Sequence, residues 1–179
     1  MKKAIGFIGS AEREMEPAQA RLSRELGGIA AQKGFVSYSG ACTGYPLEAI
    51  KGAKEAGGIT IGIAPACSFE EHTEKWDYPA KEFDSIVFTG MGRARNFLII
   101  RASDAVVVLG GRVGTLNEVS FAYDEGKVIG VLEGFGGIAS KMKELNEWFS
   151  VKKTGARIVF AGSPAELIER ILKLIPGRI

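Results

Sequence analysis

The sequence predicts an α/β fold in which one doubly wound, mainly parallel sheet of about seven strands carries helices on both faces. Short apolar runs alternate with amphipathic stretches along the whole chain, without a linker, a repeat or a low-complexity segment. Glycine-rich turns follow four of the apolar runs. The length of 179 residues suits one domain, so we expect residues 1–179 to form a single unit.

The expected strands are short apolar runs, several of them rich in β-branched side chains. They cover 4–8, 35–38, 59–64, 85–89, 105–109, 128–132 and 157–160. Between them, apolar residues recur at helical spacing over 17–33, 44–56, 93–103, 114–123, 139–149 and 164–175. Pro17 and Pro164 suit first helical turns, and Ser163 with Glu166 forms a capping box before the last helix. This order of elements predicts parallel strands joined by helical crossovers.

Residues 66–82 interrupt the alternation with a polar, aromatic and aperiodic stretch. A loop of this length in a compact domain is commonly a lid or a binding loop. His72 has no partner nearby in the sequence, so we treat it as an ordinary loop residue.

The strand at 105–109 runs directly into Gly110 and Gly111, and then into Gly114 and Thr115. Glycines permit a tight turn, and the helix that follows aims its free N–H groups and the positive end of its dipole at one place. Such a turn suits an anion, most often a phosphate. The alternative is a turn without a ligand, which rarely requires three glycines and a hydroxyl residue.

Three further glycine turns, at 9–10, 40–44 and 90–92, also follow expected strands. The carboxyl ends of parallel strands share one edge of a sheet, and ligands bind at that edge in doubly wound folds. By residue type, Met91 and Cys42 suit packing better than chemistry. The candidate ligand-binding residues at this edge are Ser10, Gly40, Thr43, Gly44, Met91, Arg93, Gly110, Gly111, Gly114 and Thr115.

Two arginines follow the turn at 90–92. A guanidinium at this edge can fork onto a phosphate or a carboxylate, which makes Arg93 and Arg95 candidates for contact with an anionic group. The alternative is that they are surface arginines. We expect the fourth and fifth strands to be neighbours about 4.8 Å apart, so that Arg95 after the fourth and Glu118 after the fifth can converge on one ligand.

Glu118 lies in the first turns of the helix that begins near Gly114. A glutamate there also complements the helix dipole, which is worth only tenths of a kcal/mol. Helical periodicity places Glu118 opposite the stripe of Leu116, Val119 and Tyr123. From periodicity alone we therefore expect this side chain to face away from the core.

Composition excludes several classes of function. The 23 Lys and Arg against 21 Asp and Glu leave a net charge of +2, and no basic block occurs, which argues against nucleic acid as the main partner. Cys42 and Cys67 make no disulfide framework, and a single histidine argues against a metal site. Neither a signal peptide nor an uncharged membrane-spanning stretch is present, so we expect a cytoplasmic protein without membrane contact.

The run Phe97–Ile100 is apolar around the whole helix, because successive residues turn by about 100°. A helix that covers one face of a sheet needs only one apolar stripe. Phe121 is likewise an apolar residue that lies outside the apolar stripe of its own helix. Both features predict a subunit interface in a homo-oligomer.

Two stretches resemble the LOG (LONELY GUY) family, formerly described as possible lysine decarboxylases, which includes the molybdenum cofactor carrier proteins. The first is Met-Gly-Arg-Ala-Arg-Asn at 91–96, followed by Leu-Gly-Gly-Arg-Val-Gly-Thr-Leu-Asn-Glu at 109–118. The family signature is a methionine, an Arg-Lys pair and Pro-Gly-Gly-x-Gly-Thr-x-x-Glu. The second, at 39–65, is a glycine-rich turn, a helix, a Gly-Gly pair and a strand that ends in Gly-Ile-x-Pro. The resemblance covers roughly residues 4–135.

This resemblance implies a Rossmann-like fold, a dimer or a tetramer of dimers, and a small phosphorylated ligand at the 110–115 turn. AMP, phosphate or a molybdopterin-type molecule would suit the turn, and no cofactor is required. In the cytokinin-activating members an arginine and a glutamate cleave the N-glycosidic bond of a nucleoside 5′-monophosphate. The matching residues here are Arg95 and Glu118, which the resemblance makes the candidate catalytic pair.

The chain departs from the family signature at several positions. Asn96 stands in place of the lysine, Leu109 in place of the proline, and Arg112 with Val113 makes the turn one residue longer. Residues 43–46 are Thr-Gly-Tyr-Pro where cytokinin-type members have Gly-Leu-Met-Gly. These differences indicate the carrier-like branch.

Two classes of function stay open. One is an enzyme that hydrolyses a nucleoside monophosphate to its base and ribose 5-phosphate. The other is a non-catalytic carrier or sensor of a phosphorylated pterin, such as the molybdenum cofactor, or of a nucleotide. A third alternative, a DNA-processing protein of related fold, is disfavoured by the near-neutral charge.

Overall fold

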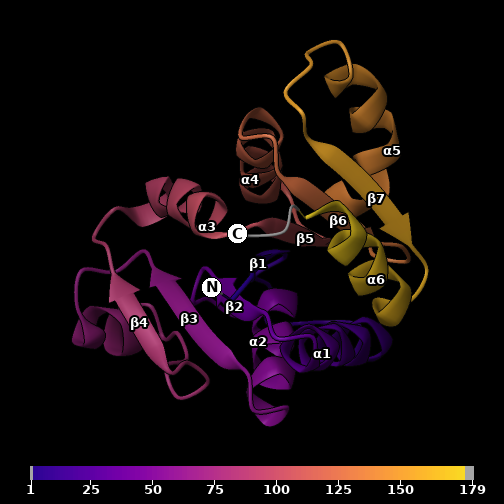
Figure 1. Ribbon diagram of the computed structural model, residues 1–179. Helices are drawn as coiled ribbons and strands as arrows, with labels where there is room; N and C mark the ends of the chain where they lie inside the picture. Colours follow the sequence, from indigo (N-terminus) through magenta and orange to yellow (C-terminus); the bar gives the residue numbers. More distant parts are fainter. Residues whose placement is uncertain (1, 176–179) are drawn as a thin grey trace.

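The computed structural model describes residues 2–175 and contains one seven-stranded sheet (Figure 1). Every neighbouring pair of strands is parallel, and their order across the sheet is β4-β3-β2-β1-β5-β6-β7. The strands are β1 (Ala4–Gly9), β2 (Val36–Ser39), β3 (Ile59–Ala64), β4 (Ser85–Phe88), β5 (Ala105–Leu109), β6 (Val128–Leu132) and β7 (Arg157–Ala161). The predicted α/β fold with a parallel sheet is confirmed.

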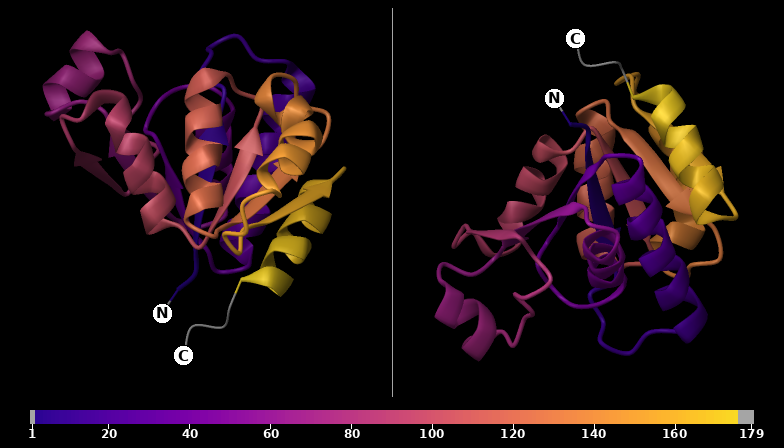
Figure 2. Two further views of the ribbon diagram at one scale, coloured as in Figure 1. Left: turned by 90° about the horizontal axis from the view of Figure 1, so that it is seen from above. Right: turned by 60° about the horizontal axis from the view of Figure 1, so that its bottom comes forward.

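Helices cover both faces of the sheet (Figures 1 and 2). They are α1 (Pro17–Gln32), α2 (Tyr45–Glu55), α3 (Asn96–Ala102), α4 (Val113–Asp124), α5 (Ile138–Phe149) and α6 (Pro164–Leu174). α1 and α2 lie on one face, and α3, α4 and α5 on the other, as right-handed crossovers require when the chain extends the sheet first in one direction and then in the other. α6 follows the last strand and packs beside α1 on the first face. None of the helices between residues 2 and 175 is long and apolar enough to cross a membrane.

The central strands are buried on both faces, which explains their continuous apolar sequences. All five residues of β5 are buried, and β1 beside it is buried from Ala4 to Ile8. Phe7 pairs with Val107 in the register of these two strands. By contrast, the outer strand β4 alternates between exposed and half-buried residues.

The reversal of chain direction lies between β1 and β5. The chain adds β2, β3 and β4 on one side of β1 and then returns to place β5, β6 and β7 on the other side. The backbone N–H of Ser10, just after β1, donates to the carbonyl oxygen of Leu109 at the end of β5 (3.0 Å). In doubly wound sheets this switch point opens the crevice that receives a ligand.

The apolar run Phe97–Ile100 is only partly explained within one chain. Ile99 and Ile100 are fully buried in the core, so they need no second subunit. Phe97 is 38% exposed, and its ring packs edge-on against Phe121 with centroids 5.3 Å apart. The predicted helix at 93–103 also begins later, because Gly92–Arg95 forms a 3₁₀ turn before α3.

Candidate functional site

A cavity of about 590 Å³ opens at the carboxyl edge of the sheet, over the ends of β1, β2 and β5. Eight of the twelve predicted site residues line it: Ser10, Gly40, Thr43, Arg93, Arg95, Gly114, Thr115 and Glu118. They come from the turns after β1, β2 and β5 and from the segment after β4. Turns distant in sequence therefore converge on one space.

The other four predicted site residues do not line the cavity: Gly44, Met91, Gly110 and Gly111. The three glycines have positive φ angles and turn the backbone beneath the cavity. Gly111, for example, leaves no room for a Cβ atom, which would lie 2.1 Å from Thr115 Oγ1. Met91 precedes the 3₁₀ turn, and its side chain is 48% exposed.

The first turn of α4 faces the cavity without a capping side chain. Arg112 is the N-cap residue but its side chain does not cap the helix, and no acidic residue occurs in the first turn. The N–H groups of Val113, Gly114 and Thr115 have no acceptor within the helix, because the first turn of any helix lacks one. A Cβ atom on Gly114 would meet nothing within 4 Å, so space for an anion lies next to these donors.

Arg95 reaches the site by a different route from the one that the sequence indicated. β4 and β5 are not neighbours, because β3, β2 and β1 lie between them, so the expected convergence across adjacent strands is wrong. Instead, the segment after β4 crosses back over the strand ends. Gly92 N–H donates to the carbonyl of Pro65 after β3 (3.1 Å), and Arg95 Nη2 then donates to the carbonyl of Gly40 after β2 (3.1 Å).

Gly40 is the residue that lets Arg95 lie flat against the backbone. A Cβ atom at this position would come within 2.2 Å of Arg95 Nη2 and 2.7 Å of its Cζ atom. The guanidinium is 9% exposed, and its Nη1 atom donates to the side-chain oxygen of Asn96. Arg95 Nε is buried, and none of the described residues accepts its proton. A buried charged donor without an acceptor lowers the stability of the fold.

Glu118 is buried at 8% exposure, and the prediction that it faces away from the core is wrong. α4 buries Thr115, Glu118, Val119 and Ala122, whereas Leu116 is only half-buried. The apolar stripe predicted the wrong direction for the Glu118 side chain, because α4 packs against α3 as well as against the sheet. This second contact encloses the Glu118 side of the helix.

Arg95 and Glu118 form a buried ion pair at the cavity. Arg95 Nη1 lies 3.8 Å from Glu118 Oε1, which is too long for a hydrogen bond. Burial raises the pKa of Glu118 from 4.5 to about 7, although the charge of Arg95 opposes the shift. Near neutral pH this carboxyl is therefore divided between its neutral and ionised forms, a state suited to moving a proton.

Several lining residues were not among the predicted site residues. Glu12 and Arg112 form an ion pair at the rim, and Ser10 Oγ donates to Glu12 Oε2 (3.3 Å). Cys42 accepts a hydrogen bond from Arg95 Nη2 (3.4 Å), and burial raises the pKa of its thiol. Trp76, in the segment 66–82, also lines the cavity. Only the length and aromatic content of that segment signalled a role in binding.

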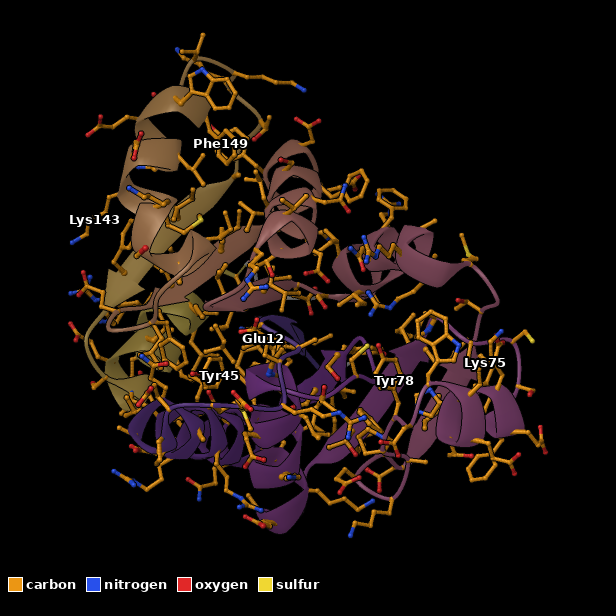
Figure 3. All side chains as sticks on the ribbon, turned by 180° about the vertical axis from the view of Figure 1, so that it is seen from behind. Glu12, Tyr45, Lys75, Tyr78, Lys143 and Phe149 are labelled. Atoms are coloured by element: carbon orange, nitrogen blue, oxygen red, sulfur yellow. The ribbon has the colours of Figure 1, made fainter. Side chains whose placement is uncertain are left out.

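Tyr78, from the same segment, also lines the cavity; Figure 3 labels it together with Glu12 of the loop after β1. Burial raises the pKa of Tyr78 to about 12. His72 lies beneath it and is fully buried, so it is not the ordinary loop residue that we expected. Its Nε2 atom lies 3.0 Å from the carbonyl oxygen of Pro79, and its ring packs between Tyr78 and Phe88.

No group of three or more His, Cys, Asp or Glu side chains within residues 2–175 could hold a metal ion. The polar groups that the cavity offers include backbone N–H donors, guanidinium groups, carboxyls and the hydroxyl groups of serine and threonine. Such groups suit a phosphate or another oxyanion.

Comparison with known proteins places the chain in a family. It belongs to the SLOG cluster4 family, whose model matches residues 2–168. An uncharacterized protein of Archaeoglobus fulgidus is 35% identical over 129 residues, which cover 72% of this chain and 79% of the relative.

Two solved structures carry informative names. The molybdenum cofactor binding protein of Rippkaea orientalis is 28% identical with a TM-score of 0.82, over 98% of this chain and 99% of that one. The molybdenum cofactor carrier protein of Chlamydomonas reinhardtii is 29% identical with a TM-score of 0.77, over 97% and 98% of the two chains. The predicted likeness to these carriers is confirmed, and the catalytic activity of LOG enzymes stays a prediction.

The buried carboxyl of Glu118 predicts a pH-dependent gain in stability for Glu118→Gln. Because the native pKa is raised to about 7 from 4.5, ionised Glu118 destabilises the fold above pH 7 by about 3 kcal/mol, and the cost vanishes below pH 4.5. Glutamine removes the charge. We expect the variant to be more stable than wild type at pH 8 by up to about 3 kcal/mol, with little difference at pH 4.5.

Urea unfolding at the two pH values measures this difference. Glu147→Gln, on the exposed face of α5, is the matched control and should change stability little at either pH. An equal effect of Glu118→Gln at both pH values would show that ionisation of this carboxyl is not the cause.

Proposed function

We propose that this protein binds a small phosphorylated ligand in the cavity at the β1–β5 switch point. The observation that carries the proposal is the buried, positively charged Arg95. It lines the same cavity as the open first turn of α4. A phosphate oxygen can accept from a guanidinium while other oxygens accept from helix N–H groups.

The charges at the cavity favour an anion in spite of two carboxyl groups. Arg93, Arg95 and Arg112 line the cavity together with Glu12 and Glu118. Glu118 is partly neutral near pH 7, because burial raises its pKa, and Glu12 is paired with Arg112. The remaining positive charge and the dipole of α4 therefore attract an anion.

The ligand class that we propose is a phosphorylated pterin of the molybdenum cofactor type, which the protein would hold and release as a carrier. The names of the two similar solved proteins, one binding and one carrying the molybdenum cofactor, support this choice. The departures from the LOG signature at Asn96 and Leu109 point in the same direction. A nucleoside monophosphate such as AMP has a similar phosphate and a flat ring, and is a practical probe of the site.

Arg95→Gln tests the binding site. We expect AMP to raise the melting temperature of the wild type, and the substitution to weaken AMP binding about tenfold or more, since a hydrogen bond to a charged group contributes about 1.5–3 kcal/mol. Isothermal titration calorimetry gives the dissociation constants. Arg101→Gln, on the exposed side of α3, is the control and should bind as wild type does.

Wild type that is stabilised by no phosphate, nucleotide or pterin would contradict the proposed function. Binding that is equally strong in Arg95→Gln would place the anion elsewhere.

A second candidate function is hydrolysis of the N-glycosidic bond of a nucleoside 5′-monophosphate. The specific observation in its favour is the Arg95–Glu118 pair, buried at the cavity with a carboxyl pKa near neutrality. Water would attack the ribose carbon, and the base would leave with a proton. The ionised carboxylate would stabilise the developing oxocarbenium ion or orient the water, and Arg95 would position substrate and glutamate.

Incubation with AMP, followed by chromatography for free adenine, separates the two functions. If the protein is a hydrolase, Glu118→Gln should bind AMP nearly as wild type does but lower turnover by about two orders of magnitude or more. The reason is that the carboxylate stabilises the charged transition state more than the ground state. If wild type binds AMP and releases no adenine, hydrolysis is contradicted and the carrier function is the one that remains.

We also propose that the protein is a homo-oligomer, a dimer or a tetramer of dimers, that pairs through the α3–α4 face. The exposed Phe97 and its neighbour Phe121 support this interface, because a ring pair at the surface gains stability when a partner covers it. Light scattering should give at least twice the chain mass of 19.1 kDa. A monomer mass at micromolar concentration would contradict this proposal.

A further inference from the structure

The segment 66–82 presents two aromatic side chains to the cavity. Trp76 and Tyr78 both line it, and their ring centroids lie 5.6 Å apart with a tilt of 46°. Trp76 is 37% exposed, so part of its ring is accessible to a ligand. Figure 2 shows the segment at the β4 end of the sheet, on the edge where the strands end.

The segment is held in place by several contacts rather than lying loose on the surface. A π-helical turn at Glu71–Lys75 precedes Trp76, whose indole N–H donates to Glu71 Oε1 (3.4 Å). Asp77 forms an ion pair with Arg13 (2.7 Å), and its carbonyl accepts from the same guanidinium (2.8 Å). The contacts of Asp77 join the segment to the loop after β1.

The aromatic pair lies apart from the anion-binding turn. The segment 66–82 follows β3, whereas α4 follows β5, and β2 and β1 lie between these two strands. A chain of contacts spans the distance, from Trp76 through Tyr78 and Cys42 to Arg95 and Glu118. Three side chains lie between Trp76 and Glu118 in this chain of contacts, so a ligand with a ring at one end and a phosphate at the other suits the cavity.

We infer that Trp76 and Tyr78 form a ring-binding subsite, so that the ligand is a phosphate ester that carries a flat heteroaromatic ring. This inference rests on the proposed phosphate site. It concerns the ring of the ligand, which the phosphate site does not contact. The ring stacks on the exposed face of Trp76, and Tyr78 packs beside it. Stacking on an aromatic side chain accepts any flat ring, so the subsite selects for flatness rather than for one pattern of hydrogen bonds.

The chain has two tryptophans, Trp76 and Trp148, which permits a direct experiment. Trp148 is 73% exposed on α5 and does not line the cavity, so Trp148→Phe leaves Trp76 as the single fluorescent reporter. In this background, AMP should quench Trp76 fluorescence on binding. Ribose 5-phosphate, which has the phosphate and sugar without the ring, should bind without comparable quenching.

Substitution of Trp76 separates the two ends of the ligand. Stacking contributes about 1–3 kcal/mol per base, so Trp76→Ala should weaken AMP binding about tenfold and change ribose 5-phosphate binding within about twofold. Trp76→Phe keeps an aromatic face and should retain AMP affinity within about threefold of wild type. Calorimetry supplies the dissociation constants of all three proteins.

The outcomes are distinguishable. An equal loss of affinity for AMP and ribose 5-phosphate in Trp76→Ala, or no loss for either, would overturn the ring subsite while the phosphate site stands. Wild type that binds neither compound, nor any pterin phosphate, would overturn the proposed function and the ring subsite with it. Loss of AMP binding in Trp76→Ala, restored in Trp76→Phe, supports the subsite.

Discussion

The candidate site depends on the close approach of the Arg95 guanidinium to the backbone at Gly40. This contact joins the segment that returns from the outer strand β4 to the turn after β2, near the middle of the sheet. It is possible only because residue 40 has no side chain, since a Cβ atom there would lie 2.2 Å from Arg95 Nη2. Together with the packing of α3 against α4, this contact places the Arg95 cation beside Glu118.

The polar groups around this contact are placed at the expense of stability. A carboxyl whose pKa rises to about 7 lowers the stability of the fold, and so does a guanidinium N–H that finds no acceptor among residues 2–175. The core around them is apolar and closely packed, with β5 and most of β1 fully buried. Such a core tolerates a few costly groups at one edge, and costly groups of this kind concentrate at functional sites.

Much of the fold could be predicted from the sequence, because continuous β-branched runs such as 105–109 suit only strands buried on both faces. The glycine turn after that strand also predicted the open first turn of α4. The order of the strands could not be predicted, since periodicity says nothing about which strands are neighbours. Glu118 was misplaced because one apolar stripe cannot reveal that α3 covers a second side of α4. Trp76 and Tyr78 were not predicted as cavity residues, because the segment 66–82 has neither helical nor strand periodicity. Without such periodicity, the direction of a side chain cannot be inferred from the sequence.

The ion pair between Glu12 and Arg112 at the rim has a consequence for ligand exchange. An anion that approaches Arg112 does not meet a bare guanidinium; it replaces a carboxylate that belongs to the protein itself. When the anion departs, Glu12 can take its place at once. The exchange of one partner for the other changes the free energy little, because exposed ion pairs contribute only about 0–1 kcal/mol. Arg112 would therefore exchange Glu12 for a ligand anion at the rim with little change in free energy. The affinity for the ligand would then depend on the buried groups deeper in the cavity.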